Sequence, residues 1–183
     1  MKMKKILALL MAAVMLFALA ACGGNTDDDT KAQSLAVCLA SEPDTIDPAL
    51  NSSVDGATLV AHLFSGLAKW AQDEAGKLVI VADAAEELVE GVENEDGTVT
   101  YTYTLKEGLT WSDGQPLKAS DFVFAWNRAA SVELAGDYNY MFDVVKGYAE
   151  MWETDESGET FVNPDAKLAV EATDDKTLVV TLN

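Results

Sequence analysis

The sequence predicts an α+β fold, a mixed or antiparallel sheet with helices packed on it. Three observations support this class. Residues 98–105 alternate between threonine and larger apolar side chains, residues 167–183 form a strand–turn–strand pattern, and two stretches, after residues 53 and 120, have helical periodicity. Apolar residues make up 49% of the 183-residue chain, which is enough to bury a sizeable core.

The first 21 residues have the three parts of an export signal. Three lysines in MKMKK precede the apolar run from Ile6 to Ala21, and small residues end it. The run is shorter than the ~20 residues needed to span a hydrocarbon core. Residues 1–21 are therefore predicted to be a signal peptide, and an uncleaved membrane helix is the alternative.

Residues 22–34 are polar and acidic, and they predict a flexible tether with a reach of roughly 20 Å. Removal of residues 1–21 leaves nine basic residues against 31 acidic ones, a net charge of −22. A body this negative repels nucleic-acid backbones and anionic lipid surfaces. The charge therefore excludes nucleic acid as a partner.

The next residues predict a strand, a loop and a helix. Residues 34–40, SLAVCLA, form an apolar run that indicates a buried strand with Cys38 as a small core residue. Two prolines in the following segment exclude regular structure there. A helix should begin at Ser53 or Asp55, with His62 on its solvated flank. Its apolar face is expected to comprise Leu59, Val60, Leu63, Phe64 and Leu67.

The remaining elements are predicted from alternation and turn residues. A strand with Val99, Tyr101, Tyr103 and Leu105 on one face follows the turn at 94–97, which favours a hairpin. After a second turn at 112–116, Ser120 is expected to cap a helix whose apolar face comprises Phe122, Val123, Trp126 and Ala130. The last two strands flank an Asp-Asp turn, and the final strand is expected to leave an exposed sheet edge.

The sequence offers no catalytic or metal-binding pattern. It has one histidine, and Cys38 is the only cysteine beyond Cys22, so zinc sites and Cys-His or Ser-His nucleophiles lack their parts. We therefore expect no enzyme activity, no metal and no cofactor. Tyr138 and Tyr140 lie in an irregular segment, where aromatic side chains either line a ligand groove or cover the edge of a core.

Leu19–Cys22, Leu-Ala-Ala-Cys followed by two glycines, resembles the lipobox of bacterial lipoproteins. The resemblance implies that diacylglycerol is attached to Cys22 and that the chain is cleaved before it. Two acyl chains provide stable membrane anchoring. The protein would then lie on the outer face of the cytoplasmic membrane, on the periplasmic side in a diderm organism.

Four further stretches resemble the peptide-binding lipoproteins that serve ABC importers, the oligopeptide/dipeptide group of family 5 solute-binding proteins. They are SEPDTIDPAL at 41–50, LFSGL at 63–67, residues 101–129 with WSDGQPLKASDFV, and KLAVEATDDKTLVVTL at 167–182. The resemblance implies a two-lobed periplasmic-binding-protein-like fold of type II, cluster C. Residues 35–183 would be the N-terminal part of its first lobe, incomplete and truncated.

The same resemblance implies a function and a set of site residues. Such proteins capture an extracellular peptide in a cleft and deliver it to a permease and its ATPase. Ser52, Ser53, Val54 and Tyr138 match ligand-facing positions, although Ser52 stands where some oligopeptide binders carry an acid. A second set, Trp111, Ser112, Asp113, Gly114, Pro116, Asp121, Phe122 and Trp126, is interpreted as a structural motif.

Other classes of function remain open from the sequence. The solute could be a nickel complex, haem, glutathione or an oligosaccharide in place of a peptide. The protein could also be a surface lipoprotein with a structural or adhesive role, or an extracytoplasmic hydrolase whose catalytic part is not in this sequence. Permease and ATPase genes beside its own would favour import.

Overall fold

The computed structural model describes residues 35–183, so the predicted signal peptide, lipobox and tether lie outside the described residues. Leu39–Asn183 form one compact unit, and Cys38 belongs to the preceding one. The strand predicted at 34–40 is wrong over the described part, because residues 35–40 have no regular structure and Cys38 is exposed. An apolar run becomes a strand only where a partner strand accepts its backbone hydrogen bonds.

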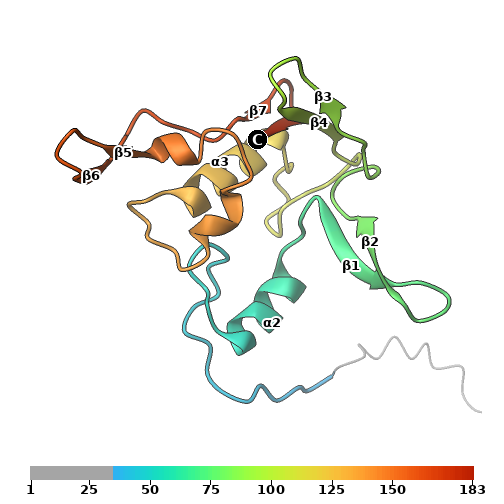
Figure 1. The fold of residues 1–183 in the computed structure, drawn as a ribbon. Helices are drawn as coiled ribbons and strands as arrows, with labels where there is room; N and C mark the ends of the chain where they lie inside the picture. Colours follow the sequence, from blue (N-terminus) through green and yellow to red (C-terminus); the bar gives the residue numbers. More distant parts are fainter. Residues whose placement is uncertain (1–34) are drawn as a thin grey trace, which may run out of the picture. The chain divides into compact units, whose positions relative to one another are not determined.

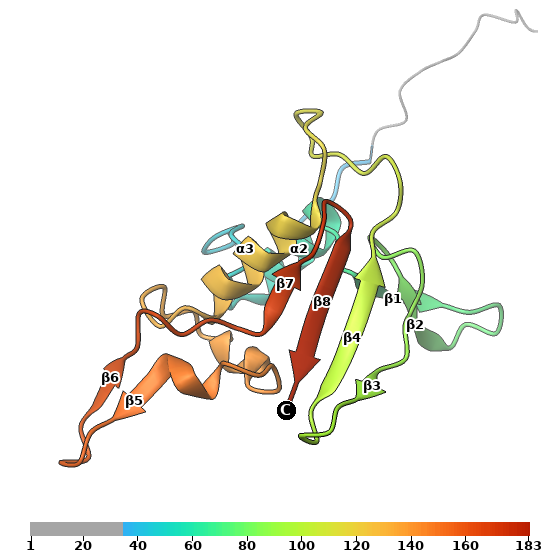
Figure 2. The same cartoon turned by 90° about the horizontal axis from the view of Figure 1, so that it is seen from above.

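The centre of the unit is a four-stranded antiparallel sheet, shown in Figure 2. Its order is β3 (Val92–Glu93), β4 (Val99–Thr104), β8 (Thr177–Leu182) and β7 (Val170–Ala172). The predicted alternating strand, the hairpin before it and the final hairpin are confirmed. The exposed edge expected at the final strand is wrong, because β8 is hydrogen-bonded to β4 on one side and to β7 on the other.

Helix α3 (Ala119–Ala130) packs against β7 and β8, as Figure 2 shows. Its predicted apolar face is confirmed, since Phe122 and Ala130 are buried and Val123 and Trp126 pack on the same core. The buried residues that join helix and sheet include Leu105, Leu168, Val170, Leu178 and Val180.

The predicted cap of α3 is wrong by two residues. The helix is preceded by Lys118, not Ser120, and the capping group is the carboxylate of Asp121. This carboxylate accepts the backbone N–H of Lys118 at 2.9 Å and the indole N–H of Trp111 at 3.1 Å. An acid at the third helical position satisfies the N–H that precedes the helix, so the helix begins earlier than Ser120.

Helix α2 (Val54–Leu63) begins where it was predicted, because the Ser53 hydroxyl accepts the N–H of Gly56 at 3.2 Å. It ends sooner than the apolar pattern indicated. Leu67 lies beyond the helix, directly before β1 (Ala68–Gln72), which pairs with β2 (Leu78–Ala82). Leu63 and Phe64 are exposed, so part of the predicted apolar face of this helix is not buried against the rest of the described chain.

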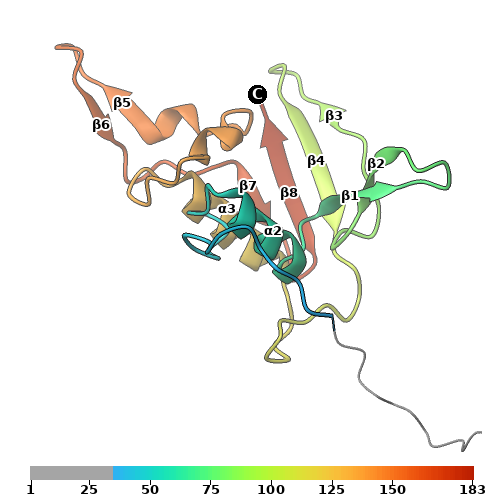
Figure 3. The same ribbon diagram turned by 90° about the horizontal axis from the view of Figure 1, so that it is seen from below.

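The remaining elements are short. Two 3₁₀ turns, η1 (Asn139–Phe142) and η2 (Ala149–Met151), follow α3. The hairpin of β5 (Trp152–Thr154) and β6 (Thr160–Val162) then extends away from the sheet (Figures 1 and 3). No helix within residues 35–183 is both long enough and apolar enough to cross a membrane.

Candidate ligand-binding site

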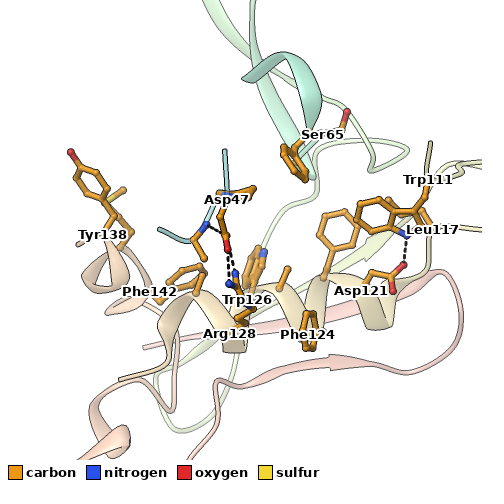
Figure 4. A pocket seen from close by; sticks show the side chains of 18 residues that line it. Asp47, Ser65, Trp111, Leu117, Asp121, Phe124, Trp126, Arg128, Tyr138 and Phe142 are labelled. Carbon is orange, nitrogen blue, oxygen red and sulfur yellow. Dashed lines mark hydrogen bonds and ion pairs between the residues drawn. The ribbon is translucent and has the colours of Figure 1, made fainter. Parts of the chain in front are cut away.

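A cavity of about 580 Å³ lies along one face of α3 (Figure 4). Its walls come from α3, from the segments before α2 and β1, from the turn before α3 and from η1. Most of the lining side chains are aromatic or aliphatic: Pro48, Ala49, Phe64, Leu117, Phe122, Phe124, Ala125, Trp126, Ala129, Met141 and Phe142, with Trp111 and Tyr138. The charged lining residues are Asp47, Asp121 and Arg128. Apolar walls with few polar groups are typical of small-molecule sites.

Asp47 and Arg128 form a two-pronged ion pair in this wall. The Arg128 Nη1 donates to Asp47 Oδ1 at 2.9 Å and Nη2 donates to Oδ2 at 2.6 Å. Their side chains are 29% and 35% exposed. The hydrogen bonds from Arg128 lower the pKa of Asp47 below its ordinary value, although burial opposes the shift. The pair therefore stabilises the fold above the ordinary aspartate pKa, and this contribution is lost as the pH falls through the lowered pKa.

At the end of the cavity away from Tyr138, the indole N–H of Trp111 donates to the Asp121 carboxylate, as Figure 4 shows. The turn at residues 112–116, which lies between Trp111 and Asp121 in the sequence, has the conformation that its glycine and aspartate predict. Gly114 has a φ of 85°, and the Asp113 carboxylate accepts the N–H of Gln115 at 2.9 Å. Pro116 continues the turn into a bridge with Thr110, and Ser112 lies exposed in it. Four members of the predicted structural motif, Trp111, Asp121, Phe122 and Trp126, also line the cavity, which the sequence did not indicate.

The predicted ligand-facing residues divide into two groups. Tyr138 lines the cavity at the end away from Trp111, and its ring lies 6.1 Å from that of Tyr140. Ser52, Ser53 and Val54 are not among the lining residues, although Ser52 and Val54 are exposed. Ser53 is occupied in capping α2. Ligand contact by these four residues stays a prediction.

The Asp47–Arg128 pair could not be predicted from the sequence, because its members are 81 positions apart. One signal was available. Arg128 is the only arginine in the chain, and it follows three aromatic residues within one predicted helix. Among the described residues, no group of three or more histidines, cysteines and acids could hold a metal ion.

The family model for "Bacterial extracellular solute-binding proteins, family 5 Middle" matches residues 80–183. The chain belongs to this family. Its match with the probable deoxycholate-binding periplasmic protein YgiS of Escherichia coli (strain K12) is 34% identical over 151 residues, covering 78% of this chain and 24% of YgiS. Its match with the oligopeptide-binding protein OppA of Bacillus subtilis (strain 168) is 30% identical over 174 residues, covering 90% of this chain and 29% of OppA.

This family 5 chain is also similar to a solved structure, Listeria monocytogenes OppA bound to peptide. The TM-score is 0.57 and the identity 31%, with 75% of this chain and 24% of that one covered. The predicted periplasmic-binding-protein-like fold is therefore confirmed. The chain spans less than a third of the length of each curated relative named above.

Proposed function

We propose that the protein is the substrate-binding lipoprotein of an ABC importer and that it captures peptides outside the cell. The observation that carries the proposal is the family match together with the similarity to OppA of Listeria monocytogenes, which is bound to peptide. Permease and ATPase subunits would be the partners that receive the captured peptide. The protein would bind and release its ligand without breaking a bond.

The proposed capture relies on the peptide backbone. Main-chain hydrogen bonds to an extended peptide give affinity that does not depend on side-chain identity, and water-filled pockets accommodate different side chains. We assign ligand contact to Ser52, Ser53, Val54 and Tyr138. Val54 is 83% exposed and Tyr138 is 52% exposed, so both have surface to offer a ligand.

An apolar carboxylate is a second candidate ligand. The relative YgiS is named as a probable deoxycholate-binding protein. The aromatic lining of the cavity suits a rigid apolar body better than a peptide backbone, which needs many hydrogen-bonding groups. Deoxycholate is therefore the comparison ligand for the binding test.

Titration calorimetry of the full-length protein with a pool of short peptides should give saturable heat. Deoxycholate and a mixture of free amino acids serve as parallel titrants, and circular dichroism confirms that the protein is folded. Saturable heat with the peptide pool alone supports the proposal. Saturable heat only with deoxycholate favours the second candidate, and no heat from the folded protein with any peptide contradicts peptide capture.

The proposed membrane anchor is tested through the two cysteines of the chain. Cells that express the protein are grown with a labelled fatty acid, and the label is followed in the purified protein. Cys22→Ala should abolish labelling, because the thioether needs the Cys22 sulfur, whereas the matched variant Cys38→Ala should keep it. Labelling that persists in Cys22→Ala would contradict anchoring at this residue.

A further inference from the structure

The two segments to which the proposed function assigns ligand contact come from distant parts of the sequence. Ser52 and Ser53 directly precede α2, Val54 is its first residue, and Tyr138 follows α3. A peptide that touches both requires a fixed separation between them. Hydrogen bonds and close packing connect the two segments, and the ion pair of Asp47 and Arg128, drawn in Figure 4, joins the Asp47 turn to α3.

The connection from Asp47 to residue 53 is a continuous series of hydrogen bonds. Asp47 Oδ1 accepts the N–H of Ala49 at 3.0 Å, and the Asp47 carbonyl accepts the N–H groups of Leu50 and Asn51 at 3.1 and 2.9 Å. The Asn51 side chain donates to the Ser53 carbonyl at 3.1 Å and accepts the Ser53 hydroxyl at 3.2 Å. The orientation of the Asp47 carboxylate is thus coupled to the start of α2.

The second connection, between the Asp47 turn and the segment that contains Tyr138, is made by close packing. Arg128 lies in the last turn of α3, and the chain returns to the Asp47 turn at Gly136. A Cβ built on Gly136 would lie 2.4 Å from the carbonyl oxygen of Ala49, so the two backbones are in direct contact. The Gly136 carbonyl accepts the N–H of Asn139 at 3.1 Å, which fixes the turn that contains Tyr138.

We propose that Asp47 and Arg128 are positioning residues, which hold the 52–54 segment and Tyr138 at the separation that the ligand requires. The inference rests on the proposed function for its ligand. Two parallel hydrogen bonds fix the orientation of both side chains, which a single lysine contact does not do. The ion pair influences ligand binding through the positions of Ser53 and Tyr138.

Arg128→Lys tests the pair, because it keeps the charge and removes the two-pronged geometry. We expect peptide affinity to fall about tenfold at a temperature where the variant is fully folded. The matched control is Lys69→Gln, which breaks the 2.7 Å ion pair with Asp83 beside the β1–β2 hairpin. Lys69→Gln should leave peptide affinity unchanged. Unchanged affinity in Arg128→Lys would overturn the proposal.

A double-mutant cycle separates positioning from general destabilisation. Arg128→Lys and Tyr138→Phe are measured singly and together. If Arg128 acts through the Tyr138 segment, the combined loss of affinity should be smaller than the sum of the single losses. Additive losses would overturn the proposal, because a role limited to fold stability creates no coupling in binding.

Hydrogen exchange provides a readout that needs no ligand. Arg128→Lys should speed the exchange of backbone amides in residues 49–54 and in residues 135–139 together, while Lys69→Gln should change neither segment. Unchanged exchange in either segment would overturn the positioning role even if no peptide binds. Failure of peptide binding by the unmodified protein would instead contradict the proposed function.

Discussion

Replacing Leu105 with alanine is expected to lower the free energy of unfolding by about 2–5 kcal/mol. Leu105 is 1% exposed, and it belongs to the core that joins α3 to the four-stranded sheet. Its backbone N–H also donates to the carbonyl of Lys176 at 2.9 Å, so the site cannot easily collapse around a smaller side chain. The loss combines the transfer of the removed methyl groups with the cavity that remains.

Urea unfolding followed by circular dichroism measures this effect. The matched control is Leu78→Ala in β2, where the leucine is 60% exposed. The control should change the free energy of unfolding by no more than about 0.5 kcal/mol, because little apolar surface is lost. Similar losses in the two variants would show that Leu105 is not part of the core.

Replacing Gly147 with alanine should also destabilise the protein, by about 2–5 kcal/mol. Gly147 has a φ of 97°, which side chains other than glycine rarely adopt. A Cβ at this position would also lie 2.1 Å from the carbonyl oxygen of Lys167. The backbone here cannot move aside freely, because the neighbouring Lys146 donates its backbone N–H to the Thr181 carbonyl and accepts the N–H of Ala169.

Gly76→Ala separates the two causes of this loss. Gly76 has a φ of 77°, but a Cβ there would have no atom within 4 Å. The free energy of unfolding of this variant should fall only by the cost of the left-handed backbone conformation, about 1–2 kcal/mol. Thermal unfolding of both variants provides the comparison. An equal loss in the two would mean that the contact with Lys167 contributes nothing.

The elements that were predicted correctly depend on neighbours in the sequence. The alternation of 98–105 requires only that successive side chains point to opposite faces, and the turns at 94–97 and 112–116 depend on glycine and aspartate within them. The face of α3 follows in the same way from its helical spacing. Tyr138 lines the cavity, and ligand contact by Ser52, Ser53, Val54 and Tyr138 stays a prediction.

The errors occurred where another segment decides the local structure. Residues 35–40 have strand composition but no strand in the described residues pairs with them. Leu67 fits the apolar face of α2, yet its carbonyl accepts the N–H groups of Asp83 and Ala85, which directs the chain into β1. The start of α3 shifts because the Asp121 carboxylate also holds the Trp111 indole.

Local patterns in the sequence were enough to predict the class of fold, the order of most strands and helices, and the family resemblance that the family match confirms. Three features became visible only in the folded chain: β8 lies inside the sheet, a cavity runs along α3, and Asp47 pairs with Arg128. The physical reason is the range of the interactions. Periodicity and turns act over a few residues, whereas the ion pair joins residues 81 positions apart that only folding brings together.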